Sequence, residues 1–369
     1  MVFPVYASHV SSPIVQNDWV VRWELTQDDG IRIYNVTYKG VLFLRDARVP
    51  GVIVRYFSGG CFFYDEFLAG WILHTNIFVE DLNGGVLDPS EQGFQIRGDY
   101  DVPGYNYQLI WRFHADGVFL ALLEIGGPGC FAPHIYETRW KFDFAVTEDN
   151  RNTFVQYSNG GWMPVREEGE ILDTGERDSS RTFTNWKVAS GRRAYYFAPY
   201  DTPIAAWAPG IALVVQKHPG EIENSRIPGI VTPYIYRGIV VYDGDGDSIY
   251  DSGEPAMPGT SPTLGMALED DPKLKYNDAN GNNRWDAGEA SVYDSNTDDK
   301  YDLGEPVIFG TAPAAGTGLK DDPKFKSTPS ESVWRKDIVV WYISRHYHDP
   351  RTPLEAPILT GLIFYPSGY

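Results

Sequence analysis

The apolar residues of this 369-residue chain recur in short runs that fit β-strands, and a helical period sustained over three turns is hard to find anywhere. The runs at 19–25, 31–38 and 107–113 are rich in Val, Ile, Tyr and Trp, as strands are. Turn signals such as Asp116-Gly117 separate them, and 37 Gly and 26 Pro punctuate the chain. The pattern predicts an all-β fold, a large β-sandwich.

The charge of the chain excludes one class of partner. The sequence has 31 Lys and Arg against 50 Asp and Glu, a formal net charge of −19. Nucleic-acid binding needs clustered Lys and Arg to neutralise phosphates, so we expect no nucleic-acid partner. No apolar run approaches the roughly 18 residues that a membrane helix requires, so we expect no membrane span.

A segment of different composition interrupts the β pattern. From Tyr242 to about Ser332 the chain is dominated by Asp, Asn, Gly and Pro. Val241-Tyr-Asp recurs at Val292, and Asp270-Asp-Pro-Lys recurs at Asp321, in both cases 51 residues later (292 − 241 and 321 − 270). A shared period indicates a duplicated module. We therefore predict three parts, with a first sandwich part at 1–240, a duplicated calcium-binding insertion at 241–332 and closing sandwich strands at 333–369.

The calcium prediction for the insertion comes from three stretches with the spacing of an EF-hand loop. Each places oxygen-bearing side chains at loop positions 1, 3, 5, 9 and 12, and a backbone carbonyl at position 7 would complete the shell. Oxygen ligands without Cys or His nearby favour calcium over zinc. The predicted ligands are Asp243, Asp245, Asp247, Ile249, Asp251 and Glu254 in the first loop; Asp278, Asn280, Asn282, Arg284, Asp286 and Glu289 in the second; and Asp294, Asn296, Asp298, Lys300, Asp302 and Glu305 in the third.

The loops depart from the EF-hand pattern in two ways. The glycine usual at position 6 is replaced by Ser248, Asn283 and Asp299, and the flanks are strand-like or end in Pro, so these are not helix–loop–helix hands. The alternative interpretation is a solvated acidic linker. The loops contain five, three and four carboxylates in chain order, so we expect affinity to fall from the first to the third to the second. About three ions would bind and order the insertion.

So many calcium loops suit millimolar calcium, which predicts an extracellular or cell-surface location. No signal peptide is visible at the start of the sequence. Asn35-Val-Thr37 is a short glycosylation sequon, and Cys61 and Cys130 form either one disulfide or two free thiols.

Several motifs resemble the catalytic domain of copper amine oxidases. The stretch from Asp337 to Arg351, which contains His348, is similar to the closing signature that carries that family's third copper histidine. Ala132-Pro-His134-Ile-Tyr136 resembles its "A-P…H-x-H" strand. Tyr105-Asn-Tyr107-Gln looks like the site whose tyrosine becomes topaquinone. The resemblance covers roughly 15–240 and 333–369 and implies a sandwich of that family with the calcium segment inserted.

The same resemblance implies a copper site and shows what it lacks. The family holds copper with three imidazoles; His134 and His348 match two of them, and the third falls on Tyr136. Tyr107 would be the quinone precursor and Asp65 the base, while a glutamine stands at 108 in place of the expected acid. The ligand set is incomplete, so we expect no bound copper, no topaquinone and a catalytically degenerate scaffold. His346, two residues from His348 on one strand, is the candidate substitute ligand.

Three functions follow from these patterns. The first is a secreted, calcium-stabilised structural protein that forms a homo-oligomer, such as a surface layer or a filament. The alternative is a divergent copper and topaquinone amine oxidase acting on a small amine. The third is a carbohydrate- or peptide-binding module that uses aromatic side chains such as Trp162 and Trp207.

Overall fold

The computed structural model describes residues 9–10, 12–26, 29–56, 62–65, 74–82, 92–102, 105–127, 132–146, 151–173, 175–180, 184–200, 210–216, 240–256, 262, 264, 266–294, 299–301, 307–311, 313–314, 316–327, 332–349 and 358–369. These residues form strands and turns without any helix, which confirms the all-β prediction. Within this described part, therefore, no helix is long and apolar enough to cross a bilayer.

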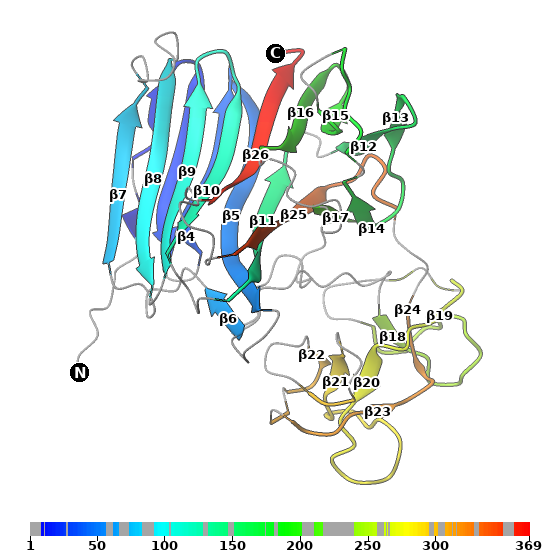
Figure 1. The fold of residues 1–369 in the computed structure, drawn as a ribbon. Helices are drawn as coiled ribbons and strands as arrows, with labels where there is room; N and C mark the ends of the chain where they lie inside the picture. The colour runs from blue at the N-terminus through cyan, green and yellow to red at the C-terminus, as the bar shows by residue number, and fades with distance from the viewer. Residues whose placement is uncertain are drawn as a thin grey trace. The chain divides into compact units, whose positions relative to one another are not determined.

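The chain divides into two compact units (Figure 1). Unit 1 comprises 1–166, 170–214 and 333–369, and unit 2 comprises 167–169 and 215–332. The longer segment of unit 2, 215–332, contains the predicted insertion at 241–332. Cys61, Cys130 and Trp207 lie outside the described residues.

Unit 1 contains two large sheets, here called sheet A and sheet B (Figure 1). The described part of sheet A has the order β1-β3-β4-β5-β11-β25-β17-β14, with β2 on β3 and β6 on β5. Its strands are β1 (His9–Val10), β2 (Ile14–Gln16), β3 (Trp19–Thr26), β4 (Gly30–Tyr38), β5 (Val41–Tyr56), β6 (Phe62–Asp65), β11 (His134–Phe144), β14 (Gly169–Leu172), β17 (Ile211–Gln216) and β25 (Ile338–His348).

Sheet B has the order β13-β12-β15-β16-β26-β10-β9-β8-β7 in its described part. Its strands are β7 (His74–Asp81), β8 (Gly93–Val102), β9 (Tyr105–His114), β10 (Phe119–Gly126), β12 (Thr153–Ser158), β13 (Gly161–Pro164), β15 (Trp186–Ser190), β16 (Arg193–Pro199) and β26 (Ile358–Ser367). The C-terminal strand β26 lies between β10 and β16, so the end of the chain completes the middle of this sheet (Figure 1).

Aromatic side chains fill the space between the two sheets. Phe364 of β26 is fully buried, and its ring centroid lies 5.2 Å from that of Phe142 on β11 and 5.1 Å from that of Phe197 on β16. Trp111 of β9 packs edge-to-face against Trp140 of β11 at 5.8 Å. Side chains of both sheets therefore interdigitate as in a β-sandwich, which is the predicted architecture.

An ion cluster lies in sheet A of unit 1. The carboxylate of Asp46, only 8% exposed, binds the guanidinium of Arg32 and that of Arg48, the latter at 2.9 Å. Arg48 also binds Asp29 at 2.9 Å. Burial by itself would raise the pKa of Asp46, but Arg48 and Arg32 outweigh it and hold that pKa below its usual range. These buried charges are neutralised by the protein's own cations.

The described residues of unit 2 form two small sheets. One has the order β18-β24-β19 and the other the order β22-β21-β20-β23. The strands are β18 (Val240–Tyr242), β19 (Glu269–Asp270), β20 (Leu274–Tyr276), β21 (Ser291–Tyr293), β22 (Val307–Phe309), β23 (Lys320–Asp321) and β24 (Phe325–Ser327). The pairs β18 and β21, β19 and β23, and β20 and β24 are each 51 residues apart (291 − 240, 320 − 269 and 325 − 274), so the sequence duplication is also a structural one.

Candidate functional site

The first candidate site begins with two histidines on neighbouring strands of sheet A. His134 starts β11, His348 ends β25, and the two are directly opposite in the antiparallel register. Nδ1 of His134 lies 2.7 Å from the carbonyl oxygen of Ala132, which accepts its hydrogen. Nε2 of His134 is then an acceptor, 3.0 Å from Nδ1 of His348. Burial lowers the pKa of His134, in keeping with a neutral imidazole.

Two further side chains share the face of this histidine pair. Tyr136 and His346 are opposite each other, two residues along β11 and β25, so they point to the same side as His134 and His348. The Tyr136 ring is 1% exposed and stands edge-on to His134 with centroids 4.7 Å apart. Nδ1 of His346 is buried and has no hydrogen-bond partner among the residues that the structure describes. Burial, with a smaller contribution from His348, lowers the pKa of His346 to about 4.

Tyrosines of sheet B and of β5 complete this cluster. Tyr107 is 2% exposed and its ring lies 6.0 Å from that of Tyr105, its neighbour but one on β9. Tyr105 stands edge-on to Tyr136 at 6.0 Å, and its hydroxyl contacts that of Tyr56, which is directly opposite His134. The sequence motifs did not single out Tyr56, and the only signal for Tyr105 was its spacing of two from Tyr107.

The three positions expected to hold copper carry only two imidazoles, and the third imidazole of this face, His346, lies at a different position. Two imidazoles bind each other, and a phenol occupies the strand position on which the third ligand was expected. Gln108 donates from Nε2 to Oδ1 of Asp99 at 2.9 Å, so its side chain is held by β8. Asp65 is directly opposite Val52 in the backbone register, and its side chain lies outside the described atoms.

The second candidate site is the first acidic loop of unit 2. The carboxylates of Asp243, Asp245 and Asp247 each place an oxygen within 4.8 Å of the others. Asp243 is fully buried and accepts hydrogen bonds from the backbone N–H of Gly246 at 2.6 Å and of Ser248 at 2.9 Å. These bonds wrap the loop around the Asp243 carboxylate.

The twelfth residue of this loop closes it. Glu254 accepts from the N–H of Gly244 through Oε1 at 2.6 Å and from the N–H of Asp251 through Oε2 at 2.9 Å. Both ends of the loop are thereby tied to one carboxylate. Of the predicted carboxylate ligands of this loop, Asp243, Asp245 and Asp247 converge, and Asp251 and Glu254 are not part of that group.

Position 6 has the same backbone conformation in all three loops. The φ angles of Ser248, Asn283 and Asp299 are 62°, 60° and 60°, in the left-handed region. The EF-hand glycine is used for this sharp turn, and here three other residues adopt it, including Ser, which tolerates it less readily than Asn or Asp.

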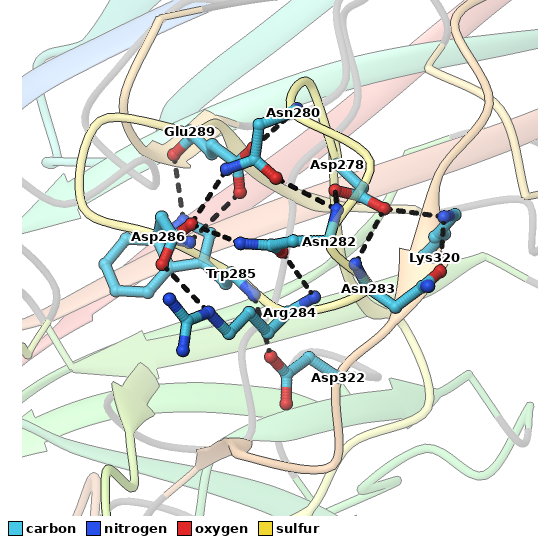
Figure 2. A network of polar contacts seen from close by, with 10 residues as sticks. All are labelled: Asp278, Asn280, Asn282, Asn283, Arg284, Trp285, Asp286, Glu289, Lys320 and Asp322. Atoms are coloured by element: carbon cyan, nitrogen blue, oxygen red, sulfur yellow. Dashed lines mark hydrogen bonds and ion pairs between the residues drawn. The ribbon is translucent and has the colours of Figure 1, made fainter.

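In the second loop, protein donors already contact the carboxylates (Figure 2). The ammonium of Lys320 lies 2.6 Å from Oδ2 of Asp278 and lowers the pKa of this carboxyl. The side-chain amides of Asn280 and Asn282 donate to Oδ2 of Asp286 at 2.7 and 2.6 Å and lower the pKa of Asp286. A calcium ion here would compete with Lys320 and would require both amides to turn their oxygens inward.

The second loop is also tied to the core of unit 2. The indole Nε1 of Trp285 donates to the carbonyl of Glu289 at 2.9 Å, and its backbone N–H donates to Asp322 Oδ2 at 3.1 Å. Lys320 and Asp322 were missed as partners of this loop because they lie 42 and 37 residues from the residues they bind. Of the third loop, Asp294, Asp299 and Lys300 are described, and Asn296, Asp298, Asp302 and Glu305 are not.

Trp162, a candidate for carbohydrate or peptide binding, is engaged by the protein itself. Its Nε1 donates to Asp178 Oδ2 at 2.9 Å, and the ammonium of Lys187 lies 4.5 Å from its ring centroid. A cation over the ring takes the place that a stacked ligand would need.

Comparisons with known proteins identify the fold. The structure is similar to that of lysyl oxidase from Pichia pastoris, with a TM-score of 0.50 and 13% identity over 96% of this chain and 51% of that chain. It also matches a copper-containing benzylamine oxidase from Hansenula polymorpha, with a TM-score of 0.42 and 12% identity over 98% of this chain and 60% of that chain. The amine oxidase of Aspergillus nidulans gives a TM-score of 0.43 and 12% identity over 95% of this chain and 50% of that chain.

The class that the fold defines is thus a copper amine oxidase-like β-sandwich, as the sequence motifs predicted. The chain spans about half the length of the lysyl oxidase structure. No protein family and no curated protein matches the sequence. Sequence identity this low establishes similarity of fold only. The chemistry of the site must be inferred from the residues described above.

Proposed function

We propose that this chain is a calcium-stabilised structural protein built on an amine oxidase-like sandwich that lacks the copper chemistry. The single observation that carries the proposal is the donor set of the first site. His134 and His348 bind each other at 3.0 Å, and Tyr136 occupies the position of the third imidazole. A scaffold without its redox ion serves as a rigid building block, and copper and topaquinone are absent from this function.

Calcium is the cofactor of the proposal, at about three ions for each chain. Support comes from the first loop, where the carboxylates of Asp243, Asp245 and Asp247 converge within 4.8 Å. The left-handed backbone at position 6 recurs in the other two loops. The affinity order remains first, third and second loop, and Lys320 on Asp278 adds a reason for the weakness of the second.

The proposed location is extracellular or at the cell surface, where millimolar calcium fills loops of this kind. The proposed partner is a second copy of the chain, in a surface layer or a filament. Support comes from the 24 Tyr and 11 Trp of the chain, since these side chains can supply rigid, amphipathic contact surface.

The test is elemental analysis of the native protein combined with its particle size. We expect calcium near three ions for each chain, no stoichiometric copper, and a very large particle. Copper near one ion for each chain in a discrete dimer would overturn the proposal.

The alternative is a divergent copper and topaquinone amine oxidase that acts on a small amine. It is favoured by the buried position of Tyr107 and by the presence of a third imidazole, His346, on the face that carries His134 and His348. A coloured preparation with quinone absorbance and bound copper would establish it, and a colourless protein containing calcium alone would exclude it.

A further inference from the structure

Within one chain, the two duplicated modules of unit 2 each insert a strand into the sheet of the other. We call 240–276 the first module and 291–327 the second module. Strand β20 of the first module lies between β21 and β23 of the second, and β24 of the second lies between β18 and β19 of the first. Each module therefore contributes the central strand of a sheet whose two flanking strands belong to the other.

This strand insertion is reciprocal, because equivalent residues of the two modules form equivalent pairs. Val240 pairs with Ser327 where β18 meets β24, and the residues 51 positions away, Ser291 and Tyr276, pair where β21 meets β20. Asp270 pairs with Lys326 in one sheet, as Asp321 pairs with Lys275 in the other. In both pairs the lysine ammonium binds the opposite aspartate, so each inserted strand carries an ion pair to the partner module.

The apolar core follows the same division. Val240, Leu274 and Tyr276 of the first module are buried in one cluster with Ile308 and Phe325 of the second. A module taken alone lacks the strand that lies between its two flanking strands, and it has only half of the apolar core. The folded form therefore requires one first module and one second module, and nothing in these contacts requires both to come from the same chain.

A single segment, 277–290, connects the modules, and it contains the second acidic loop (Figure 2). Glu289 ties this segment back on itself, since its carboxylate accepts from the N–H of Asn280 at 3.2 Å and of Asp286 at 3.0 Å. Three carboxylates lie in the segment, those of Asp278, Asp286 and Glu289. The ammonium of Lys320, in the second module, binds Asp278 of this segment at 2.6 Å, and a cation bound by the three carboxylates would replace that contact. Calcium would therefore change what holds the segment in its compact form.

We propose that unit 2 joins copies of this chain by module exchange, with the first module of one copy paired to the second module of another and 277–290 as the calcium-sensitive hinge. The inference specifies the mode of self-association and rests on the proposed structural function for its use. The contacts inside the closed and exchanged forms are the same, so the hinge and the local concentration decide between them. A short linker gives its own two ends an effective concentration in the millimolar range. Dilute chains thus close on themselves, and crowded chains with an extended hinge exchange.

Split cysteines test the exchange. In a Cys61→Ser, Cys130→Ser background, one chain carries Asp270→Cys and the other carries Lys326→Cys, two positions that face each other across β19 and β24. Directly opposed residues of an antiparallel pair lie within disulfide reach. The mixed chains are depleted of calcium, concentrated, given calcium and run on a non-reducing gel. We expect at least about a tenfold excess of disulfide-linked heterodimer over the control mixture.

The control mixture pairs Asp270→Cys with Asp321→Cys, because these positions face lysines and never each other in either form. A single chain carrying both Asp270→Cys and Lys326→Cys verifies that the variants fold, since its disulfide must form within the chain or between exchanged chains. If that chain cross-links while the split pair stays at the level of the control, the exchange is overturned.

Light scattering of the unmodified protein separates this inference from the proposed function. Large calcium-dependent particles without split-pair cross-links overturn the exchange and leave self-assembly standing. Split-pair cross-links without large particles support the exchange and overturn the surface-layer or filament role.

Discussion

Units 1 and 2 are both all-β, yet they differ in the size of their apolar cores and in how their carboxylates are neutralised. Unit 1 surrounds Phe364, Trp111 and Trp140 with a continuous apolar core and matches its buried Asp46 with Arg32 and Arg48. The described part of unit 2 has two small apolar clusters of six and four buried residues, and three carboxylates converge in its first acidic loop. Unit 1 is thus stabilised by a large core and internal ion pairs, whereas unit 2 has little core and, under the proposed function, gains stability from bound calcium.

Removing calcium is the strongest test of this contrast. For one loop with free calcium a hundredfold above its Kd, binding adds about 2.7 kcal/mol to the free energy of unfolding, and several loops add together. We expect chelation to abolish the thermal transition of unit 2 and to leave that of unit 1 in place. Calorimetry with limited proteolysis of 243–305 measures this. Equal cleavage with and without chelator would remove the distinction between the units.

A matched pair of core truncations should show whether the two units unfold independently. Phe364→Ala in unit 1 is expected to cost about 3–5 kcal/mol, as truncation of a fully buried phenylalanine does. Phe325→Ala is its counterpart in unit 2, where the side chain is 2% exposed. Each variant should lower only the transition of its own unit in calorimetry. If both variants lowered both transitions together, the two units would unfold as one.

Asp46→Asn probes the internal neutralisation of unit 1. It leaves Arg32 with Glu24 and Arg48 with Asp29 as their remaining acidic partners, and we expect a loss of about 2 kcal/mol at pH 7. The pKa of Asp46 is lower in the folded protein than in the unfolded chain, so its contribution is complete above the unfolded value of about 3.9 and is lost as the pH falls toward the folded value.

Denaturant unfolding of the Asp46→Asn variant and the unmodified protein at a series of pH values measures this difference. It should shrink in acid. A difference that stays constant down to pH 2 would mean that the carboxylate charge is not the stabilising feature.

Asp243→Asn should weaken calcium binding at the first loop by about tenfold or more, which is about 1.4 kcal/mol. Asp243 is the buried first residue around which the loop wraps. Isothermal titration calorimetry measures the affinity, with Glu269→Gln as a control that removes an exposed charge outside the loops. An equal loss of calcium affinity in both variants would indicate that Asp243 acts through the overall negative charge of the unit and does not coordinate the ion.

Lys320→Met should have the smallest effect and the opposite sign. It removes the ammonium that competes for Asp278 in the second loop, so calcium affinity there should rise a few-fold. The matched control is Lys39→Met, an exposed lysine of unit 1. Unchanged affinity in the same titration would mean that Lys320 does not hinder the loop.

Much of the fold could be predicted from the sequence. The period of two in 19–25, 31–38 and 107–113 predicted strands that are present as β3, β4 and β9, and the C-terminal motif predicted β25. The repeat of 51 residues predicted a duplication, and the strands of unit 2 follow it. These features are local or periodic, which is why the sequence carries them.

What the sequence could not supply is pairing between distant segments. The contact of Tyr56 with Tyr105 depends on how β5 and β9 meet, and the contact of Lys320 with Asp278 on the register of two short strands. The strand exchange was invisible for a further reason, because a repeat with one period allows each module to pair with itself or with its copy. Only the registers of β20 and β24 distinguish these cases.

The pairing of Val240 with Ser327 has a consequence for the history of the molecule. The first and last residues of the duplicated segment are neighbours across one ladder, so the two ends of the segment lie side by side. A segment whose ends are close together can be inserted into a host fold with little change in the spacing of the host's strands.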